Sequence, residues 1–553
     1  MINRQIYLHY LGLTGAIALG AILRFWHLDL KPLWLDEIIT AIFSLGKNYR
    51  DLPLDVVFPL HQLQDIFAFK SGVSCSQIAE NLANYSTHPP LFFCGMYSWL
   101  EWLHPLSAGC VAKLRSLPAL FGVAAIIAIY GVNCLAFSPT SGIMAALFMA
   151  LSPFAVYLSQ EARHYTLPML LISIALFLLM KIKQDIFEHN SSKFWIWISW
   201  ATINSIGLYV HYFFILSLNA QILTLLFLIY RGRFKIVNFR QICLYLILST
   251  CTVIISFIPW LMVSFRHFRS SETNWLPSPQ HFEPIYQTLL NWVLMIITLP
   301  VENQPLVIQI ICSFLMVIFT IFVGLKVLAN LKLLWANHTT HFSTFTLLSF
   351  TFFVLFQFFV IAYLLGKDIT IVPRYSFVYY PSFCALIAAS FDKIRIPKYI
   401  FLIVGITSCI FVVNNLTFQK PFLPEKVAEN MNLQPTVPLM LVVKYDNYQD
   451  VAAGLSFALA LEKLRNNHPK IQDQDSLAFL DHSVDFSTIN HQLFRFSKPN
   501  ISNMNLWFVG SNMKREDFAA QLELPEKIAC NIDNNHHHRI GSYPYQLYRC
   551  GNS

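Results

Sequence analysis

The chain has 553 residues, of which 56% are hydrophobic and 12% charged, and it carries a formal net charge of +8. Globular proteins average about 45–50% apolar and about 25% charged residues, so this composition excludes a soluble fold, a disordered chain and a coiled coil. The basic residues fall in short runs between apolar segments, which argues for a chain solvated by lipid and against nucleic-acid binding. The 11 cysteines include no CxxC pair, so no zinc or redox motif is predicted.

Several apolar segments are candidates for bilayer spans, since a spanning helix needs about 20 apolar residues. The 11 segments are 7–26, 114–136, 140–158, 166–183, 194–210, 212–230, 242–265, 305–328, 342–365, 375–391 and 398–415. Two shorter apolar stretches, 88–103 and 285–300, begin next to proline or polar residues and are expected to lie at the membrane interface.

Lysine and arginine set the orientation of these spans. With the two short stretches at the interface, the basic loops 181–193, 231–240 and 393–398 fall on one side. The positive-inside rule makes that side cytoplasmic, with the N-terminus inside and the C-terminus outside. The first span has no A-x-A cleavage site, so an uncleaved anchor in the cytoplasmic membrane is predicted rather than a signal peptide.

The predicted fold is a polytopic α-helical membrane protein with a C-terminal soluble α/β domain. Residues 1–415 form the transmembrane domain, in which 27–113 are the first extracytoplasmic loop, and residues 416–553 form an extracytoplasmic domain. This domain combines strand-like runs with helical patterns. The strand-like runs are 439–443, 477–480, 506–509 and 545–548, and the helical patterns are 448–464 and 514–522.

Two further features of the tail are given structural interpretations. The run His536-His537-His538 has no carboxylate or cysteine partner at ligand spacing, so a solvated loop is predicted rather than a metal site. Cys530 and Cys550 would face an oxidising compartment, in which cysteines can pair, and the sequence leaves their pairing open.

Charged groups near hydrocarbon are costly, and in this chain they collect at the extracytoplasmic rim. The first such feature is Asp36-Glu37, just outside the first span. Adjacent carboxylates in a partly dry site repel each other, so one of them could act as a base toward an attacking hydroxyl or amine. On spacing alone, a solvated interfacial turn anchored by Trp34 explains the pair slightly better.

The second feature is His88-Pro89-Pro90, which opens the short apolar stretch. Proline suits the first turn of a helix, and the free amides of that turn favour an anion, to which His88 could add a donor or a charge. A phosphate on a lipid carrier would suit such a site. A helix cap with an incidental histidine explains the motif equally well.

The third feature is the segment Ser159 to Tyr165, which contains Glu161, Arg163 and His164 between the third and fourth spans. A Glu–Arg pair closing a helix hairpin is the structural interpretation. A plain turn would be served by Gly, Asn or Ser, so the functional interpretation is preferred, in which Glu161 and Arg163 face a cavity formed by the first loop.

Weaker signals lie on the same side of the membrane. His211 lies at the turn between the fifth and sixth spans, and Arg374 opens the tenth. Each alone is more typical of an interfacial anchor than of a ligand. Together they make the outer rim basic and aromatic, as a site for phosphate and sugar requires.

The order of these motifs resembles the GT-C membrane glycosyltransferases, particularly the protein O-mannosyltransferases and the lipid A aminoarabinose transferases. The resemblance covers residues 1–230 well and 231–415 in helix count only, and the tail carries no matching motif. The motifs that carry it are Asp36-Glu37, His88-Pro89-Pro90-Leu91, Arg115-Ser116-Leu117-Pro118-Ala119-Leu120 and Ser159-Gln160-Glu161-Ala162-Arg163-His164-Tyr165.

The resemblance implies an inverting enzyme that moves a sugar from a polyprenyl-phosphate carrier to a lipid, protein or polysaccharide acceptor. By position, Asp36 would be the base with Glu37 beside it, and His88 would contact the lipid phosphate. Arg163 and Arg374 would be further phosphate or sugar contacts. The Asp-rich metal motif of the oligosaccharyltransferase branch is represented only by Glu161, which argues against a requirement for a divalent metal.

Three hypotheses follow. The first is a glycosyltransferase acting at the extracytoplasmic face, with the carboxylates, His88 and Arg163 converging in one pocket. The second is a transporter or flippase for lipid-linked sugars, which the sequence disfavours because it shows neither inverted repeats nor polar breaks at mid-depth. The third is a membrane scaffold whose rim is catalytically inactive.

Overall fold

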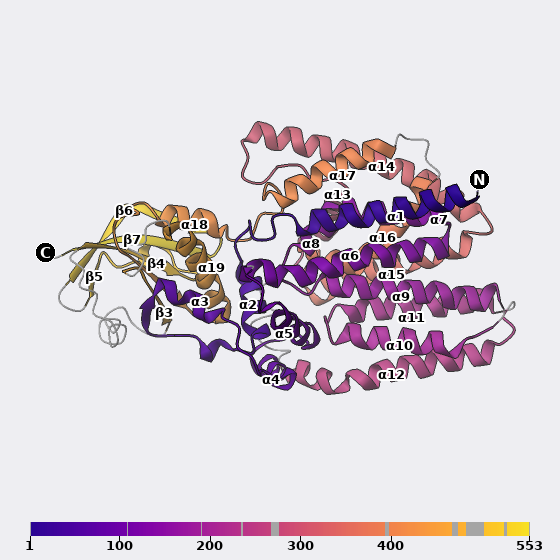
Figure 1. Ribbon diagram of the computed structural model, residues 1–553, viewed down its shortest axis with the longest axis horizontal. Coiled ribbons are helices and arrows are strands. Elements are labelled where there is room, and N and C mark those ends of the chain that lie inside the picture. Colours follow the sequence, from indigo (N-terminus) through magenta and orange to yellow (C-terminus); the bar gives the residue numbers. More distant parts are fainter. Residues whose placement is uncertain are drawn as a thin grey trace. The chain divides into compact units, whose positions relative to one another are not determined.

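The computed structural model describes residues 2–107, 109–189, 191–233, 236–266, 276–392, 398–466, 474–482, 503–524 and 528–551 (Figure 1). The chain forms two compact units. The helical unit consists of residues 1–28, 82–96 and 112–418, and the α/β unit consists of residues 29–81, 97–111 and 419–553.

Helices form at all of the segments predicted to span the membrane, and the long ones lie side by side as a bundle (Figure 1). They are α1 (Ile2–Phe25), α6 (Cys110–Ala136), α7 (Pro139–Leu151), α8 (Pro153–Ser159), α9 (Thr166–Phe187), α10 (Phe194–Leu208), α11 (Phe214–Gly232), α12 (Phe239–Arg266), α14 (Leu306–Ala336), α15 (His341–Leu365), α16 (Tyr380–Asp392) and α17 (Lys398–Val413).

Within the described part of the chain, seven helices are long and apolar enough to cross a membrane. The pair α7 and α8, bent by 59° at Ser152, would make an eighth span. The helices α10, α16 and α17 have 15, 13 and 16 residues, fewer than predicted. In α16 the difference has a local cause, because residues 373–378 form a 3₁₀ helix and the α-helix begins at Tyr380, where Pro381 suits its first turn.

The two short apolar stretches form α5 (Leu91–Leu103) and α13 (Glu283–Ile296), of 13 and 14 residues. Both are too short to span a bilayer, which needs about 20 residues. Their position at the membrane interface stays a prediction.

The surface of the bundle explains why the chain needs lipid. In α14 only 11% of the most apolar 18-residue window is buried, and side chains such as Val307, Phe314 and Leu325 are exposed. Monomeric soluble proteins rarely expose apolar surface on this scale. The helical unit is therefore that of an integral membrane protein.

The α/β unit is built on a seven-stranded sheet of order β1-β3-β2-β4-β7-β6-β5. The central strand β2 pairs in parallel with β3 and β4, and the other neighbours are antiparallel. The strands are β1 (Val57–Pro59), β2 (Leu439–Tyr445), β3 (Ser476–Asp481), β4 (Asn503–Gly510), β5 (Gln521–Leu524), β6 (Ile528–Ile540) and β7 (Tyr543–Gly551).

Part of the first loop belongs to this sheet. Strand β1 pairs with β3, with Val57 opposite Ala478. The loop helix α2 (Leu35–Ser44) packs on α19 (Tyr448–Arg465), whose Ser456 donates a hydrogen bond of 2.6 Å to the carbonyl of Leu33. Residues 29–81 and the tail therefore share one core, an association that the sequence analysis did not predict.

The tail confirms the four predicted strands and the helix at 448–464, but the predicted helix at 514–522 is wrong. Residues 515–517 form one 3₁₀ turn and residues 521–524 form β5, because pairing with β6 outweighs the local helical pattern. The histidine run is also not a loop: it lies in β6, with His537 opposite Gln546. Cys530 and Cys550 face each other across β6 and β7 and form a disulfide.

Candidate functional site

The turn between α8 and α9 brings four of the predicted site residues into the interior of the helical unit. Glu161, Arg163, His164 and Tyr165 are between 1% and 4% exposed, although they lie in a connection rather than in a helix. The turn is tight, because the backbone N–H of Arg163 donates to the carbonyl of Glu161 at 2.7 Å. Polar side chains buried to this degree need partners inside the protein.

His88 is one of those partners. Nη2 of Arg163 lies 3.2 Å from Nε2 of His88. Because a guanidinium can only donate, Nε2 of His88 is the acceptor and its proton lies on Nδ1, which donates to Oγ of Ser86 at 2.9 Å. The anion site expected at the start of α5 is partly occupied by the protein itself, because the N–H of Leu91 donates to the carbonyl of Tyr209 at 3.1 Å.

The rings of His164 and His211 lie beside this pair, tilted by 58° to each other. Their ring centroids are 4.5 Å apart, and the rings of His88 and His164 are 5.3 Å apart. Nδ1 of His211 accepts a hydrogen bond of 3.0 Å from the N–H of Phe213, so its proton lies on Nε2. The ring of His211 is therefore neutral in the observed arrangement.

Burial, reinforced by the charges around them, keeps the two histidines neutral. Burial lowers the pKa of His164 well below 6.5, and the neighbouring His211, Arg163, His88 and Arg374 lower it further. Burial also lowers the pKa of His211 well below 6.5, with His88 and Arg163 adding to the effect. The cationic neighbours that add to this shift would attract an anion, whereas burial by itself disfavours a charge of either sign.

Tyr165 links the two arginines. Its hydroxyl oxygen accepts a hydrogen bond of 3.0 Å from Nε of Arg374, which lies in the 3₁₀ helix Pro373–Val378. The guanidinium of Arg163 lies 5.7 Å from the centroid of the same ring. The structure thus brings together residues from four connections of the helical unit. We call this set the basic cluster: His88, Arg163, His164, Tyr165, His211 and Arg374.

The two predicted carboxylates lie in the α/β unit, at the start of α2. Glu37 is 0% exposed, and its Oε2 lies 3.1 Å from Nζ of Lys420, which is 3% exposed. The same oxygen accepts a hydrogen bond of 3.4 Å from the N–H of Trp34, the N-cap of α2. Asp36 is half-buried.

Glu37 and Asp36 therefore have different surroundings. Successive residues on an α-helix point about 100° apart, so Asp36 does not share the direction of its neighbour. The ion pair with Lys420 gives Glu37 a structural task, namely fixing the first turn of α2. Lys420 was not predicted, although a lysine immediately after the last apolar helix was a signal for it.

Candidate metal ligands are sparse among the described residues of this site. In the described ranges, no group of three or more His, Cys, Asp or Glu side chains is arranged to hold a metal ion. The 160–165 turn supplies one carboxylate, Glu161, among cationic neighbours. No step of the chemistry below is therefore assigned to a metal.

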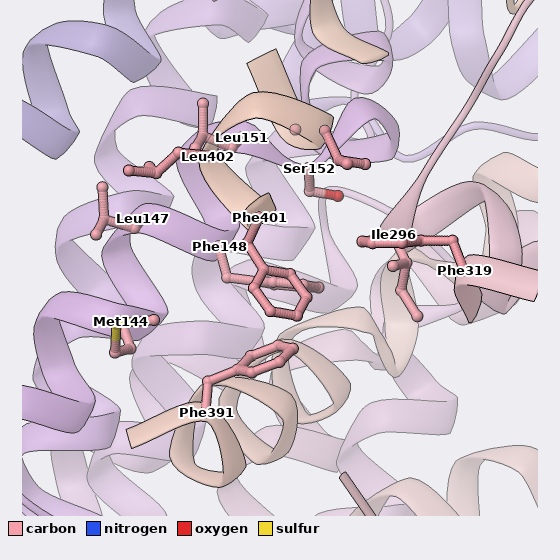
Figure 2. A pocket seen from close by; sticks show the side chains of 12 residues that line it. Met144, Leu147, Phe148, Leu151, Ser152, Ile296, Phe319, Phe391, Phe401 and Leu402 are labelled. Carbon is pink, nitrogen blue, oxygen red and sulfur yellow. The ribbon is translucent and has the colours of Figure 1, made fainter. Parts of the chain in front are cut away.

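A separate pocket lies between helices of the helical unit (Figure 2). Its lining is apolar except for Ser152, which lies at the bend between α7 and α8. Such a lining suits hydrocarbon and not a phosphate. The lining residues are Met144, Leu147, Phe148, Leu151, Ser152, Ile296, Phe319, Phe391, Phe401, Leu402, Val404 and Gly405.

No protein-family model and no curated protein matches the chain. Among solved structures, ArnT from Cupriavidus metallidurans in the apo state superimposes with a TM-score of 0.54 at 10% identity, over 98% of both chains. The same protein bound to undecaprenyl phosphate gives 0.50 at 11% identity, over 97% of both chains. AglB from Archaeoglobus fulgidus gives 0.45 at 11% identity, over 92% of this chain and 70% of that chain. Identities this low show a shared fold: the chain has the GT-C membrane fold of ArnT, as the order of its motifs predicted.

Proposed function

We propose that this protein is an integral-membrane glycosyltransferase that takes a sugar from a polyprenyl-phosphate carrier and transfers it, with inversion, to an acceptor on the extracytoplasmic face. The fold shared with ArnT supports the general kind of enzyme, and one of the two ArnT structures contains undecaprenyl phosphate. The class of acceptor (lipid, protein or polysaccharide) is not specified by this proposal.

The observation that carries the proposal is the basic cluster. Two guanidinium groups and three imidazoles come from separate connections and lie within hydrogen-bond or ring-contact distance of one another. The two guanidinium groups carry like charges that repel, and the neutral imidazoles supply N–H donors. A phosphate would be attracted by the former and could accept hydrogen bonds from the latter. Arginine is the residue best suited to this task, because its planar fork can bind two phosphate oxygens at once.

The proposed chemistry needs few groups. An acceptor oxygen or nitrogen attacks the anomeric carbon, the bond from that carbon to the phosphate oxygen breaks, and polyprenyl phosphate leaves with the bonding electrons. Asp36 takes the proton of the acceptor, a contribution of about 10²–10⁴-fold for a well-placed base. The basic cluster stabilises the negative charge on the departing phosphate.

Glu37 has a supporting role in this scheme. Its buried ion pair with Lys420 and its bond to the N-cap hold the first turn of α2, on which Asp36 lies. The other acidic residue of the motifs, Glu161, is buried beside Arg163 in sequence and is proposed to orient that turn or the sugar.

The binding half of the proposal is tested with undecaprenyl phosphate and the full-length protein in nanodiscs. Arg163→Ala and Arg374→Ala should each weaken binding by about tenfold to a hundredfold, the value of a hydrogen bond to a charged group. Arg231→Ala is the matched control, because Arg231 is an exposed arginine in the last turn of α11, away from His211. Equal losses for all three variants would contradict the assignment.

The transfer half is tested in cells that lack the gene and carry each variant, by mass spectrometry of their glycans. The wild-type gene should restore the glycan that these cells lack. Asp36→Asn should fail to restore it, although the variant should still bind undecaprenyl phosphate. Asp29→Asn removes the same charge from an exposed position of the same loop and should restore the glycan. If Asp36→Asn restored the glycan as the wild type does, the assignment of Asp36 as the base would be wrong.

A further inference from the structure

Arg24 is a buried cation that the proposed chemistry does not use. It lies in the last turn of α1, is 0% exposed, and is the only Lys, Arg, Asp or Glu between residues 5 and 25. Among the described residues, no carboxylate pairs with it. A buried charge without a counter-charge is costly, so other groups must stabilise it.

Those groups are the carbonyl of Gly20 in the same helix, at 3.0 Å from Nη1, and two carbonyls at the break between α7 and α8. The break occurs at Ser152, where the backbone is extended, and α8 begins with Pro153. Proline has no N–H, so the carbonyl of Met149 loses the donor that a continuous helix would provide four residues later. Nη2 of Arg24 donates to that carbonyl at 2.8 Å, and Nη1 donates to the next one, of Ala150, at 3.1 Å.

The neighbouring polar groups at the end of α7 also have hydrogen-bond partners. The third carbonyl in the row, that of Leu151, lies 3.2 Å from Sγ of Cys409, and the hydroxyl of Ser152 donates to the carbonyl of Met295 at 2.8 Å. Leu151 and Ser152 also form part of the wall of the apolar pocket (Figure 2). The C-terminal end of a helix favours a cation, and a guanidinium can reach two carbonyls at once, which an ammonium or an amide does less well.

The same helix α1 also holds the other end of α8. Nε2 of Gln160, the residue after α8, donates to the carbonyl of Trp26 at 2.7 Å and to that of Leu23 at 3.4 Å. Arg24 thus bonds the last turn of α7, just before the break, and Gln160 lies just after α8. Helix α1 therefore holds the chain on both sides of the seven-residue α8, which is roughly 10 Å long. The residues that follow directly are those of the 161–165 turn.

Helix α6 packs closely against the end of α8 and against Arg24. At Gly122, an added Cβ would lie 2.1 Å from Oγ of Ser159 and 2.9 Å from Nε of Arg24. Only glycine therefore lets α6 approach both the last residue of α8 and the guanidinium. The position of α8 is fixed from three directions: its start, its end and its side.

We infer that Arg24 is a positioning residue: it fixes the end of α7 through the carbonyls of Met149 and Ala150, thereby sets the start of α8 at the break, and so fixes Arg163 and His164 in the basic cluster. The expected effect on phosphate binding rests on the proposed function. The hydrogen bonds of Arg24 do not depend on it. Arg24 acts through α8 and does not itself contact the donor.

The test measures undecaprenyl-phosphate binding by the full-length protein in nanodiscs. Arg24→Met and Gln160→Ala should each weaken binding by about tenfold, and Arg24→Lys should keep most of the affinity because the cation is retained. The double variant should lose much less than the product of the two single losses, since either change already releases α8. Arg231→Met, the control, should bind as the wild type does.

The outcomes are distinguishable. Wild-type affinity in a folded Arg24→Met variant, or losses that multiply in the double variant, would overturn the inference. If Arg24→Met does not fold, Gln160→Ala and Arg24→Lys decide: wild-type binding by Gln160→Ala overturns the inference, and reduced binding with Arg24→Lys close to wild type supports it.

A second readout separates this inference from the proposed function. If the wild type itself does not bind undecaprenyl phosphate, the proposed function fails, and the titration of His164 followed by NMR of labelled histidine still tests Arg24. Release of α8 makes His164 less buried and moves it away from His211, His88 and Arg374, so its pKa should rise in Arg24→Met and stay unchanged in Arg231→Met. An unchanged titration in both variants would overturn the inference.

Discussion

The buried ion pair between Glu37 and Lys420 gives the sharpest stability prediction. Their charged atoms are 3.1 Å apart, with side-chain exposures of 0% and 3%, so solvent screens the pair little. At an effective dielectric constant of about 20, the attraction is about 5 kcal/mol, and the cost of burying both charges offsets much of it. The pair as a whole therefore contributes little net stability, but each charge depends on the other.

Removing one partner leaves the other charge buried alone. Glu37→Gln and Lys420→Met should each destabilise the first turn of α2 by about 3–5 kcal/mol. The double variant should recover most of this loss, because it buries no unpaired charge. At 1.36 kcal/mol per factor of ten, the single variants lower the protection of α2 amides by between about 10² and 10⁴-fold.

Hydrogen exchange followed by mass spectrometry on the full-length protein in nanodiscs measures this protection segment by segment. Lys426→Met and Glu429→Gln are the matched controls, because both side chains are exposed on α18 (Pro424–Met431) and make the same changes of charge. These control variants should leave the hydrogen-exchange protection of the α2 amides unchanged. Two results would refute the role given to the ion pair. One is unchanged protection of the α2 amides in the single variants. The other is a loss of protection in the double variant that equals the sum of the two single losses.

Three further predictions concern pH, close approach and the tail. Because the pKa of His164 is lowered from 6.5, the unfolded chain binds its proton first, so stability is full above pH 6.5 and falls as the pH drops below it. The melting temperature should therefore be lower at pH 5 than at pH 7.5, and less so in His164→Asn. Gly122→Ala, whose Cβ would lie 2.1 Å from a hydroxyl oxygen, should reduce expression and stability, whereas Gly324→Ala, with nothing within 4 Å, should not. Replacing Cys530 and Cys550 by serine opens a loop with a sequence separation of 20 and should lower tail stability by about 3 kcal/mol, measured by thermal unfolding with and without reductant.

The helical part of the fold could be predicted because its signal is local. A run of apolar residues long enough to span a bilayer must satisfy its own backbone, so it forms a helix whatever its neighbours are. The ends of helices were less predictable. The bend at Ser152 divides one predicted span into α7 and α8, and the 3₁₀ helix at 373–378 shortens another.

The sheet was less predictable because its pairing is not local. The three residues of β1 lie far along the chain from β3, and β5 forms within a segment of helical pattern because β6 is beside it. Strand preferences depend on cross-strand neighbours more than on the strand itself. The histidine run in β6 was misjudged for the same reason, since polar residues can form a strand when the partner strand supplies the hydrogen bonds.

Part of the candidate site could be predicted because polar side chains next to hydrocarbon carry a free-energy cost, which makes them visible in the sequence. Cationic and imidazole side chains beside apolar helices need a reason, and the structure brings His88, Arg163, His164, His211 and Arg374 together. Their roles stay proposals. The tasks of Arg24 and Lys420 could not be predicted, because each depends on a partner far along the chain that only the fold brings near.

In the proposed chemistry, the helical unit binds the phosphate and the α/β unit carries the base, so mutations in one unit should affect only one of these two tasks. The basic cluster is assembled from connections of the helical unit, whereas Asp36 lies on α2, which packs on α19 and is anchored by Lys420 within the α/β unit. Loosening α2 with Lys420→Met should therefore lower sugar transfer while the affinity for undecaprenyl phosphate stays that of the wild type. Arg163→Ala should do the reverse, with weaker phosphate binding and unchanged amide protection in α2. A loss of phosphate affinity in Lys420→Met would mean that base and phosphate site are not independent, and the division of roles would be wrong.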